Sequence, residues 1–145
     1  MLCATFSSNL YSSTNSFLPP DPNDVESLNS PVPTDTSQAA LEWITLLDQV
    51  KYSVSWSEAG SMLKDAITND QWVAAMNKLR RPLGYNKARA QRSLQRKNVL
   101  PAGSTGDFVI IKYNSAFVGQ GSAEETVALI KDKDDLWRVI HYDVH

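Results

Sequence analysis

The spacing of apolar side chains changes at Gly84, and this change constrains the fold more than any other feature of the chain. Before Gly84, apolar residues recur every three or four positions, as they do on one face of an α-helix. After Gly84 they alternate, which is typical of strands with one buried face. Helices followed by strands predict an α+β domain, in which the helices pack on one face of an antiparallel sheet.

Three helices are predicted before Gly84, over residues 38–50, 54–67 with an interruption at 60–61, and from 69 to the proline at 82. Thr36 and Ser37 are the N-cap candidates of the first helix. Thr68 and Gln71 have the form of a capping box at the start of the third. Pro82 ends that helix, because proline disfavours helical backbone in the residue before it.

Four strands are predicted after Gly84, over residues 85–100, 108–118, 124–131 and 136–144. The first is polar and exposed, and the second has the strongest strand pattern of the chain. The last is apolar on both faces, so one of its faces could serve a partner. A homodimer through the exposed sheet face would cover such a surface.

Residues 1–37 differ in composition from the rest. They are rich in serine and proline, and they carry four acids and no lysine or arginine, a net charge of -4. Such a segment buries too little apolar surface to offset the entropy of ordering, so a disordered acidic arm or tether is expected. Residues 38–145 carry a net charge of +2 and form the single folded domain.

The N-terminal residues bear on cellular location. Met1 to Pro20 have neither the positive start nor the apolar core of a secretory signal, so export by that route is not expected from the chain as written. Cys3 is a lipid-acceptor candidate if a leader once preceded it, and the arm would then be a tether. Association with a membrane is expected only in that case. The alternative is a plain arm with an ordinary thiol.

Composition excludes several classes of protein. The chain has 145 residues, a formal net charge of -2 and one cysteine. It has no run of about 18 to 20 apolar residues, so no membrane-spanning helix is expected. A single cysteine excludes an internal disulfide framework and a multi-cysteine zinc site.

The two histidines offer little catalytic chemistry. His141 and His145 lie on one face of the last predicted strand but about 13 Å apart, at about 3.3 Å per residue, so they cannot share a metal ion. His141 with Asp143 is the one acid-base pair that a small enzyme could use. A surface histidine is the alternative interpretation. Neither a metal nor another cofactor is expected.

A basic stretch is the richest local signal, since no acid occurs between Gln71 and Gly106. The candidate residues for an anionic partner are Arg80, Arg81, Lys87, Arg89, Arg92 and Arg96. One interpretation is that these charges protect an exposed edge strand against pairing with other chains. The other is an anionic partner, such as phospholipid headgroups or the acidic arm. Nucleic acid is not expected, because Tyr85 is the only aromatic residue within the basic residues 78–97 for base stacking.

Aromatic residues could line a ligand pocket between the helices and the sheet. The candidate lining is Trp72, Tyr113, Phe117, Trp137 and His141. The ligand would be a small apolar molecule. The alternative is that the aromatic residues only form the core.

Several short blocks, in order along the chain, resemble a known family. The blocks are Trp56 to Thr68 with Gln71-Trp72, Arg81 to Gly84, Gly106 to Tyr113 with Phe117, Glu125 to Val127, and Trp137 to Val139 with Tyr142. Residues 38–145 thereby resemble the uncharacterised bacterial family catalogued as domain of unknown function 4019. The resemblance implies a cone-like α+β domain similar to the nuclear transport factor 2-like, or cystatin-like, superfold. It also implies a location in the periplasm or cell envelope, and no established activity.

Three functions remain open. The favoured one is a non-catalytic binding or interaction module of the bacterial cell envelope, since no complete catalytic constellation is present. The second is a small pocket enzyme of isomerase, dehydratase or hydrolase type that uses His141. The third is a binder of anionic surfaces through residues 78–97. The superfold hosts enzymes and inert adaptors alike, so it does not choose between them.

Overall fold

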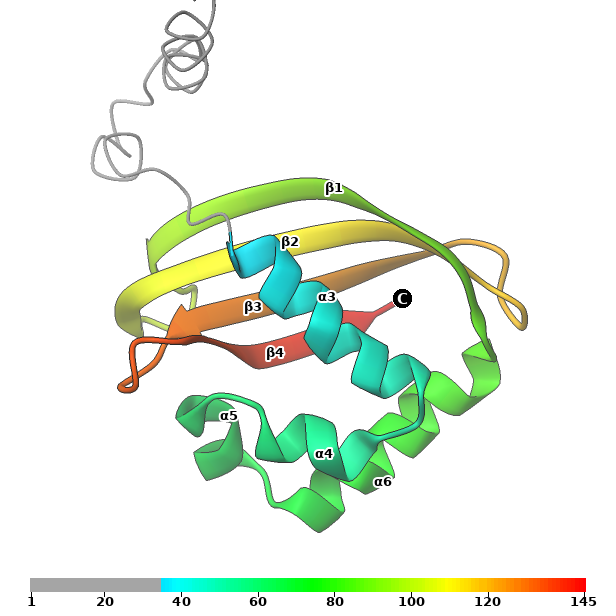
Figure 1. Ribbon diagram of the computed structural model, residues 1–145, viewed down its shortest axis with the longest axis horizontal. Helices are drawn as coiled ribbons and strands as arrows, with labels where there is room; N and C mark the ends of the chain where they lie inside the picture. The colour runs from blue at the N-terminus through cyan, green and yellow to red at the C-terminus, as the bar shows by residue number, and fades with distance from the viewer. Residues whose placement is uncertain (1–34) are drawn as a thin grey trace, which may run out of the picture. The chain divides into compact units, whose positions relative to one another are not determined.

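The computed structural model describes residues 35–145 (Figure 1). The predictions for residues 1–34 of the N-terminal arm and for Cys3 lie outside these residues, whereas residues 35–37, which were predicted to belong to the arm, form the start of the first described helix. In the described part, no helix is both long enough and apolar enough to cross a membrane.

The chain from residue 35 to residue 83 is helical. The elements are α3 (Asp35–Asp48), α4 (Tyr52–Ser57), α5 (Ser61–Ala66), α6 (Asn69–Arg80) and the 3-10 helix η2 (Arg81–Leu83). Residues 35–83 thus contain four α-helices where three were predicted, because the second predicted helix is divided at its predicted interruption, Gly60-Ser61. The N-cap prediction was wrong, because Thr36 and Ser37 lie inside the first turn of α3.

The second predicted helix is divided into α4 and α5 because the chain between them docks on a strand. The Gly60 amide donates a hydrogen bond of 2.7 Å to the Val139 carbonyl. A Cβ at Gly60 would lie 2.8 Å from Ile140 Cγ2, so a larger residue would push the two segments apart. The break thus fixes the helices against one edge of the sheet.

Helix α6 begins and ends where the sequence predicts. The predicted capping box is confirmed: the Thr68 hydroxyl accepts from the Gln71 amide, and the Gln71 side chain accepts from the Thr68 amide. The helix ends at Arg80, and Pro82 lies in η2. Gly84 then takes a positive φ of 74°, a backbone conformation that favours glycine, and the chain turns into the sheet.

The sheet has four antiparallel strands in sequential order, which confirms the predicted α+β class and four-stranded sheet. They are β1 (Asn86–Val99), β2 (Thr105–Phe117), β3 (Ala123–Lys131) and β4 (Trp137–Val144). The register places Tyr113 beside Glu125 and Val127 beside Tyr142. These four residues are all buried.

The main core lies between the sheet and the helices. In Figure 1, α3 crosses one face of the sheet, while α4, α5 and α6 lie beyond the edge formed by β4. Aromatic rings join these layers. Trp43 of α3 packs against Trp72 of α6 and Tyr142 of β4, with ring centroids 6.0 and 5.9 Å apart.

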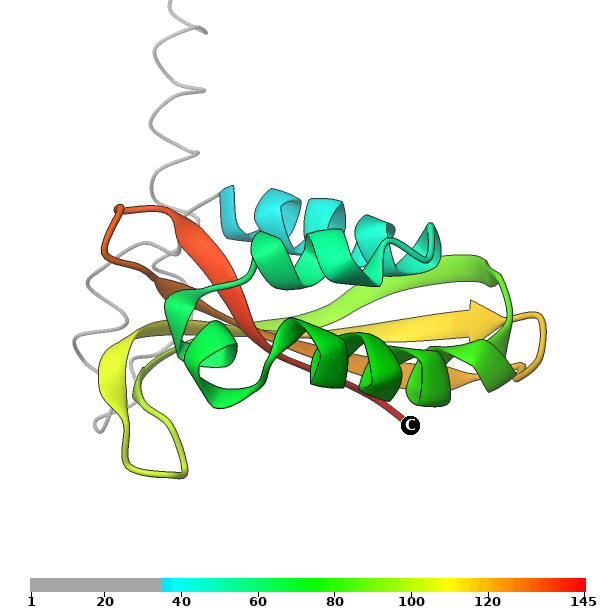
Figure 2. The same cartoon turned by 90° about the horizontal axis from the view of Figure 1, so that it is seen from below.

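The other face of the sheet carries a smaller apolar cluster. Phe108, Ala128 and Ile140 are buried there, with Ile110 and Ile130 partly buried beside them. Figure 2 shows the end of the β1–β2 hairpin bending to the side opposite α3. A bulge between Ala128 and Leu129 in the pairing of β3 with β4 shifts the alternation of β4 near Ile140.

Candidate functional site

Two arginines and two acids come together between α3, α6 and the sheet. They are Asp48 at the end of α3, Arg80 at the end of α6, Arg89 on β1 and Glu125 on β3. The side chain of Glu125 is completely buried, and those of Arg80 and Arg89 are only 4% and 8% exposed. We call these four residues the charge cluster.

The charge cluster pairs each arginine with both carboxylates. Arg80 Nη2 lies 2.6 Å from Asp48 Oδ1, and Arg89 Nη1 lies 2.8 Å from Asp48 Oδ2. Arg89 Nε lies 2.6 Å from Glu125 Oε1, and Arg80 Nη1 lies 3.5 Å from Glu125 Oε2. Two positive and two negative groups make the charge cluster neutral, so burying it leaves no charge uncompensated.

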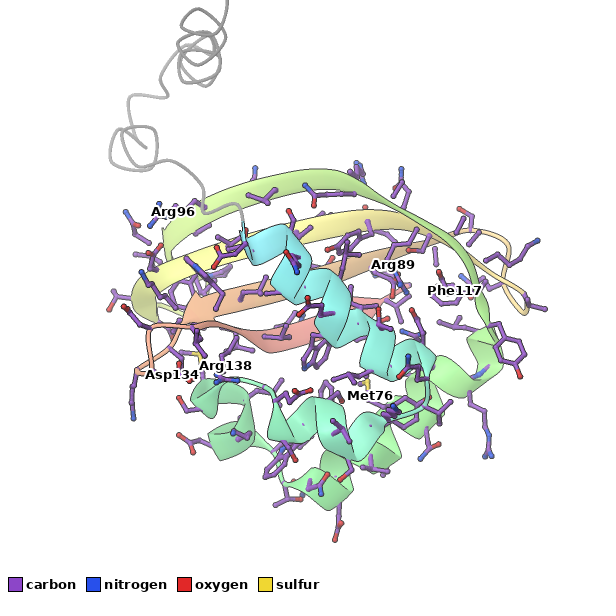
Figure 3. The ribbon with its side chains drawn as sticks, viewed as in Figure 1. Met76, Arg89, Arg96, Phe117, Asp134 and Arg138 are labelled. Carbon is purple, nitrogen blue, oxygen red and sulfur yellow. The ribbon has the colours of Figure 1, made fainter. Side chains whose placement is uncertain are left out.

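Neutral groups satisfy the remaining hydrogen-bonding capacity of the charge cluster. The Tyr142 hydroxyl donates to Glu125 Oε2 at 2.6 Å and accepts from Arg80 Nη1 at 2.9 Å. The Ser115 hydroxyl donates to Glu125 Oε1. The Arg80 guanidinium also lies over the ring of Phe117, a residue labelled in Figure 3, with Cζ 5.1 Å from the ring centroid.

These contacts shift proton affinities. Burial by itself would raise the pKa of Asp48, but the hydrogen bonds and charges of Arg89 and Arg80 outweigh burial and hold it below its usual value. Burial by itself would lower the pKa of Arg89, but Asp48 and Glu125 raise it. Burial, followed by the charge of Glu125, raises the pKa of Tyr142. At neutral pH, Asp48 is therefore ionised, Arg89 is protonated and the Tyr142 hydroxyl keeps its proton.

A cleft of about 290 Å³ leads from the charge cluster to the surface. It is lined by Leu47, Asp48, Val50, Tyr52, Asn77, Arg80, Arg81, Gly84 and Tyr85. This volume is near the lower end for small-molecule sites, at about 300 Å³. We call it the Arg81 cleft.

Apolar side chains surround the mouth of the Arg81 cleft. Tyr85 is 79% exposed and Val50 is 64% exposed. Val118, which is also exposed, is tied to Tyr85 by a backbone hydrogen bond from the Val118 amide to the Tyr85 carbonyl. Val50 has a φ of 61°, which is a strained conformation for a β-branched residue. Strained backbone of this kind is concentrated at functional sites.

Arg81 supplies the free charge of the Arg81 cleft. Asp48 and Arg80, which also line it, already pair with each other and with the rest of the charge cluster. Arg81 is exposed and forms no ion pair with any residue of the described part, 35–145. The Arg81 cleft therefore has one unneutralised positive charge at its wall and apolar surface at its mouth.

The predicted aromatic pocket is dispersed in the structure. Trp72, Tyr113 and Phe117 are buried in the main core, where Trp72 donates its indole N–H to the Ser55 hydroxyl at 3.0 Å. Trp137 is partly buried at the start of β4. His141 pairs with Ala128 on the opposite face of the sheet and is exposed, so it does not line a pocket with the others.

One buried residue of that predicted pocket lies near the charge cluster. The Tyr113 hydroxyl is buried and has no hydrogen-bond partner among residues 35–145. Burial raises its pKa to about 12, against the opposing charge of Arg89. It therefore keeps its proton at neutral pH.

The predicted basic edge is largely neutralised in space. Arg80 and Arg89 point into the charge cluster, while Arg92 pairs with Glu124 and Arg96 pairs with Asp107 at 2.6 Å. Arg81 and Lys87 form no ion pair within residues 35–145. This pairing could not be predicted from the basic stretch alone, because the acids that pair with it lie elsewhere in the sequence.

One signal could have located part of the charge cluster. Glu125 is in phase with Val127 and Leu129 of the same strand, both of which face the core. A charged residue at such a position requires a buried partner of opposite charge. Arg89 shares its buried face but lies in a strand whose pattern is mostly exposed, so nothing in the sequence marks it as that partner.

Metal ligation has no support in this part of the chain. Residues 35–145 contain no group of three or more histidine, cysteine or acidic side chains placed to hold a metal ion. The two carboxylates of the charge cluster are occupied by arginines. The arrangement can hold charges in fixed positions and present a neighbouring cation to a ligand.

The sequence was also compared with known families. A family model described as a protein of unknown function (DUF4019) matches residues 39–142. The chain belongs to the DUF4019 family. The DUF4019 match extends from α3 to β4, so it includes the whole charge cluster and every residue that lines the Arg81 cleft. A search of curated proteins found no match to the chain.

Proposed function

We propose that this DUF4019 domain is a non-catalytic binding module of the bacterial cell envelope, with the Arg81 cleft as its ligand site. The pairing of every member of the charge cluster is the observation that carries this proposal. Arginines keep their protons at all relevant pH values, and the pKa of Asp48 is lowered rather than brought toward neutrality. A general acid or base needs a pKa near the working pH, so these groups suit binding better than proton transfer.

The chemistry of the Arg81 cleft favours an amphipathic anion as ligand. Leu47, Tyr52 and Tyr85 offer apolar contact to the body of such a molecule. Arg81 offers a guanidinium that can bind a carboxylate or phosphate through two parallel hydrogen bonds. The ligand class is therefore a small anion with an apolar body, which refines the predicted apolar ligand.

A matched pair of probes tests this ligand class. We expect 3-phenylpropionate to bind saturably in calorimetry and 3-phenylpropanol, which has the same ring and chain length, to bind more weakly. Replacing Arg81→Gln should weaken binding of the acid about tenfold, since a hydrogen bond to a charged group contributes about 1.5 to 3 kcal/mol. Lys97→Gln, which removes an exposed cation near the other end of β1, should leave it unchanged. Equal binding of acid and alcohol would contradict the proposal.

A place in the cell envelope is supported by the family resemblance and by the composition of residues 1–37. A serine- and proline-rich segment behind Cys3 suits a tether on a lipidated cysteine. The test is to express the gene with its native upstream sequence in bacteria and to follow labelled palmitate. We expect a labelled, membrane-associated protein, and no label in Cys3→Ser. Recovery of unlabelled wild-type protein from the cytosol would contradict the placement.

A cone-like fold similar to the nuclear transport factor 2-like superfold is part of the same proposal. Its support is the order of elements, with helices before a strongly bent four-stranded meander. In such a cone the space between helices and sheet would be the natural ligand site. Here the main core and the charge cluster fill that space, and the Arg81 cleft remains open beside the charge cluster.

A homodimer through the sheet face is a second proposal, supported by the apolar cluster around Phe108. Ile110 and Ile130 remain partly exposed there, on the face of the sheet opposite α3. Native mass spectrometry of the wild type and of Ile130→Lys tests it. A dimer that the substitution converts to a monomer is expected, and a monomeric wild type at high protein concentration would overturn the idea.

A further inference from the structure

A second hollow lies along α3, away from the Arg81 cleft. It is a groove of about 310 Å³ between α3, the end of α4 and the start of β4. Its lining is Ala39, Glu42, Trp43, Leu46, Glu58, Trp137, Arg138 and Val139. We call it the Trp137 groove. The ligand that we infer for it does not depend on the function proposed above.

Trp137 is unlike the other tryptophans of the domain. The indole N–H groups of Trp43, Trp56 and Trp72 each donate a hydrogen bond, to the Ser55 carbonyl, the Ile67 carbonyl and the Ser55 hydroxyl. Within residues 35–145, the indole N–H of Trp137 has no such acceptor. Trp137 is partly buried and lines the groove, so part of its ring is accessible there.

Two carboxylates, those of Glu42 and Glu58, line the Trp137 groove. Glu42 of α3 accepts a hydrogen bond from the Gln38 amide at 2.8 Å, and neither Glu42 nor Glu58 forms an ion pair within the described residues. Arg138 is the only cation in the lining. It pairs with Asp134 at 2.5 Å (Figure 3), and its Nη1 also donates to the Glu58 carbonyl at 3.4 Å, so its charge lies near Glu58. The groove therefore combines two unpaired negative charges with an aromatic wall.

We propose that the Trp137 groove binds an organic cation, a primary ammonium group carried on an aliphatic stem. The stem would lie on Ala39, Leu46 and the Trp137 ring. The ammonium group would be attracted by the two carboxylates and by the face of the indole, which is the best aromatic partner for a cation. Such a group can come from a free diamine or from a lysine side chain of a peptide, and both sources share this chemistry.

The experiment follows the Trp137 indole signal in nitrogen-15 NMR spectra of the domain. The probes are 1,5-diaminopentane and a capped Gly-Lys-Gly peptide, with the acetyl-lysine peptide and an equal concentration of sodium chloride as neutral and ionic controls. We expect saturable shifts of the Trp137 signal with at least one of the two amines and none with the controls. Saturation by the diamine alone identifies a free amine as the source, and saturation by the peptide identifies a lysine side chain.

Charge removal tests whether the carboxylates hold the cation. Glu42→Gln and Glu58→Gln are both exposed substitutions, which spare the core. Each should weaken binding about two- to fivefold, and the double variant about tenfold, as expected for partly exposed ionic and cation–π contacts. Asp70→Asn, an exposed acid in the first turn of α6, is the matched control and should leave affinity unchanged.

Two results would overturn the proposal. One is the absence of a saturable Trp137 shift with both amines. The other is an affinity that the double variant leaves unchanged, because the carboxylates would then have no part in binding. Binding of 3-phenylpropionate at the Arg81 cleft is measured independently of both outcomes, so failure here leaves the Arg81 cleft untouched.

Discussion

At the scale of single residues, Glu125 is a buried charge whose removal should strongly destabilise the fold. Its carboxylate is completely buried and contacts Arg80, Arg89, Tyr142 and Ser115. A buried ion pair adds little net stability, because desolvation offsets the attraction between the charges. Removing one partner is different, since the remaining charges stay buried without compensation.

Glu125→Ala should lower the free energy of unfolding by about 3 to 5 kcal/mol, because it leaves excess positive charge in the core. Urea denaturation followed by tryptophan fluorescence measures this. The neighbouring Glu124 is the matched control, since its side chain is 23% exposed and pairs with Arg92 and Lys112 on the other face of the sheet. Glu124→Ala should cost under about 1 kcal/mol. An equal loss of unfolding free energy in the two variants would show that the charge cluster is not a buried unit.

Asp48 makes the stability of the domain depend on pH in the acid range. Its pKa in the folded protein is lowered, against burial, by Arg89 and Arg80. A lowered folded-state pKa stabilises the fold above the unfolded pKa of about 3.9, and this stabilisation is lost as the pH falls through the lower, folded-state value. Urea titrations should therefore show a loss of stability below about pH 4. Asp48→Asn should be less stable at pH 7 and lose less on acidification, and an unchanged acid profile would contradict this assignment.

At the scale of elements, the junction between η2 and the end of β2 depends on one glycine. The Gly119 amide donates to the Leu83 carbonyl at 2.7 Å. A Cβ at Gly119 would lie 2.9 Å from the Leu83 carbonyl oxygen and still closer to that of Pro82. The turn after β2 therefore packs backbone against backbone beside the Arg81 cleft.

Gly119→Ala should destabilise the domain by about 1 to 3 kcal/mol, as overpacking against rigid backbone does. Gly121 lies in the same turn, and a Cβ there would have no atom within 4 Å. Gly121→Ala should therefore change the free energy of unfolding by less than about 0.5 kcal/mol, as surface substitutions usually do. Thermal and urea denaturation of both variants measures the difference in unfolding free energy. A similar loss of stability in the two would contradict the close approach of Gly119 to the backbone of Pro82 and Leu83.

At the scale of the whole domain, one buried cluster joins the helices and the sheet. It includes Ile44 of α3, Trp72 of α6, Tyr113 of β2 and Val139 of β4. The charge cluster crosses the same boundary, since its members come from two helices and two strands. Separate unfolding of the helical part would expose both.

The described domain should therefore unfold in one cooperative step. Urea transitions followed by far-ultraviolet circular dichroism and by tryptophan fluorescence should coincide, as they do for small two-state domains. A separate early loss of helix signal, with the sheet retained, would contradict a shared core. The same measurement on Glu125→Ala should show an earlier midpoint for both signals together.

The sequence by itself determined where the helices and strands lie, because the backbone preference of a residue depends mainly on itself and its neighbours in the chain. The alternation after Gly84 predicted all four strands, and Thr68 with Gln71 predicted the start of α6. The interruption of the second helix at Gly60-Ser61 was also predicted, but the contact that holds it was not. The break at Gly60 depends on its contact with Ile140, which lies in the last strand, far along the chain.

The tertiary structure alone decided which charges are free. Arg80 and Arg81 are neighbours in the sequence, yet Arg80 is 5% exposed within the charge cluster and Arg81 is exposed at the cleft. Likewise, the pairing of β3 with β4 placed His141 on the same face as Ala128, away from the main core. The physical reason is that burial and ion pairing depend on distances between residues far apart in the chain, and a local pattern contains no information on those distances.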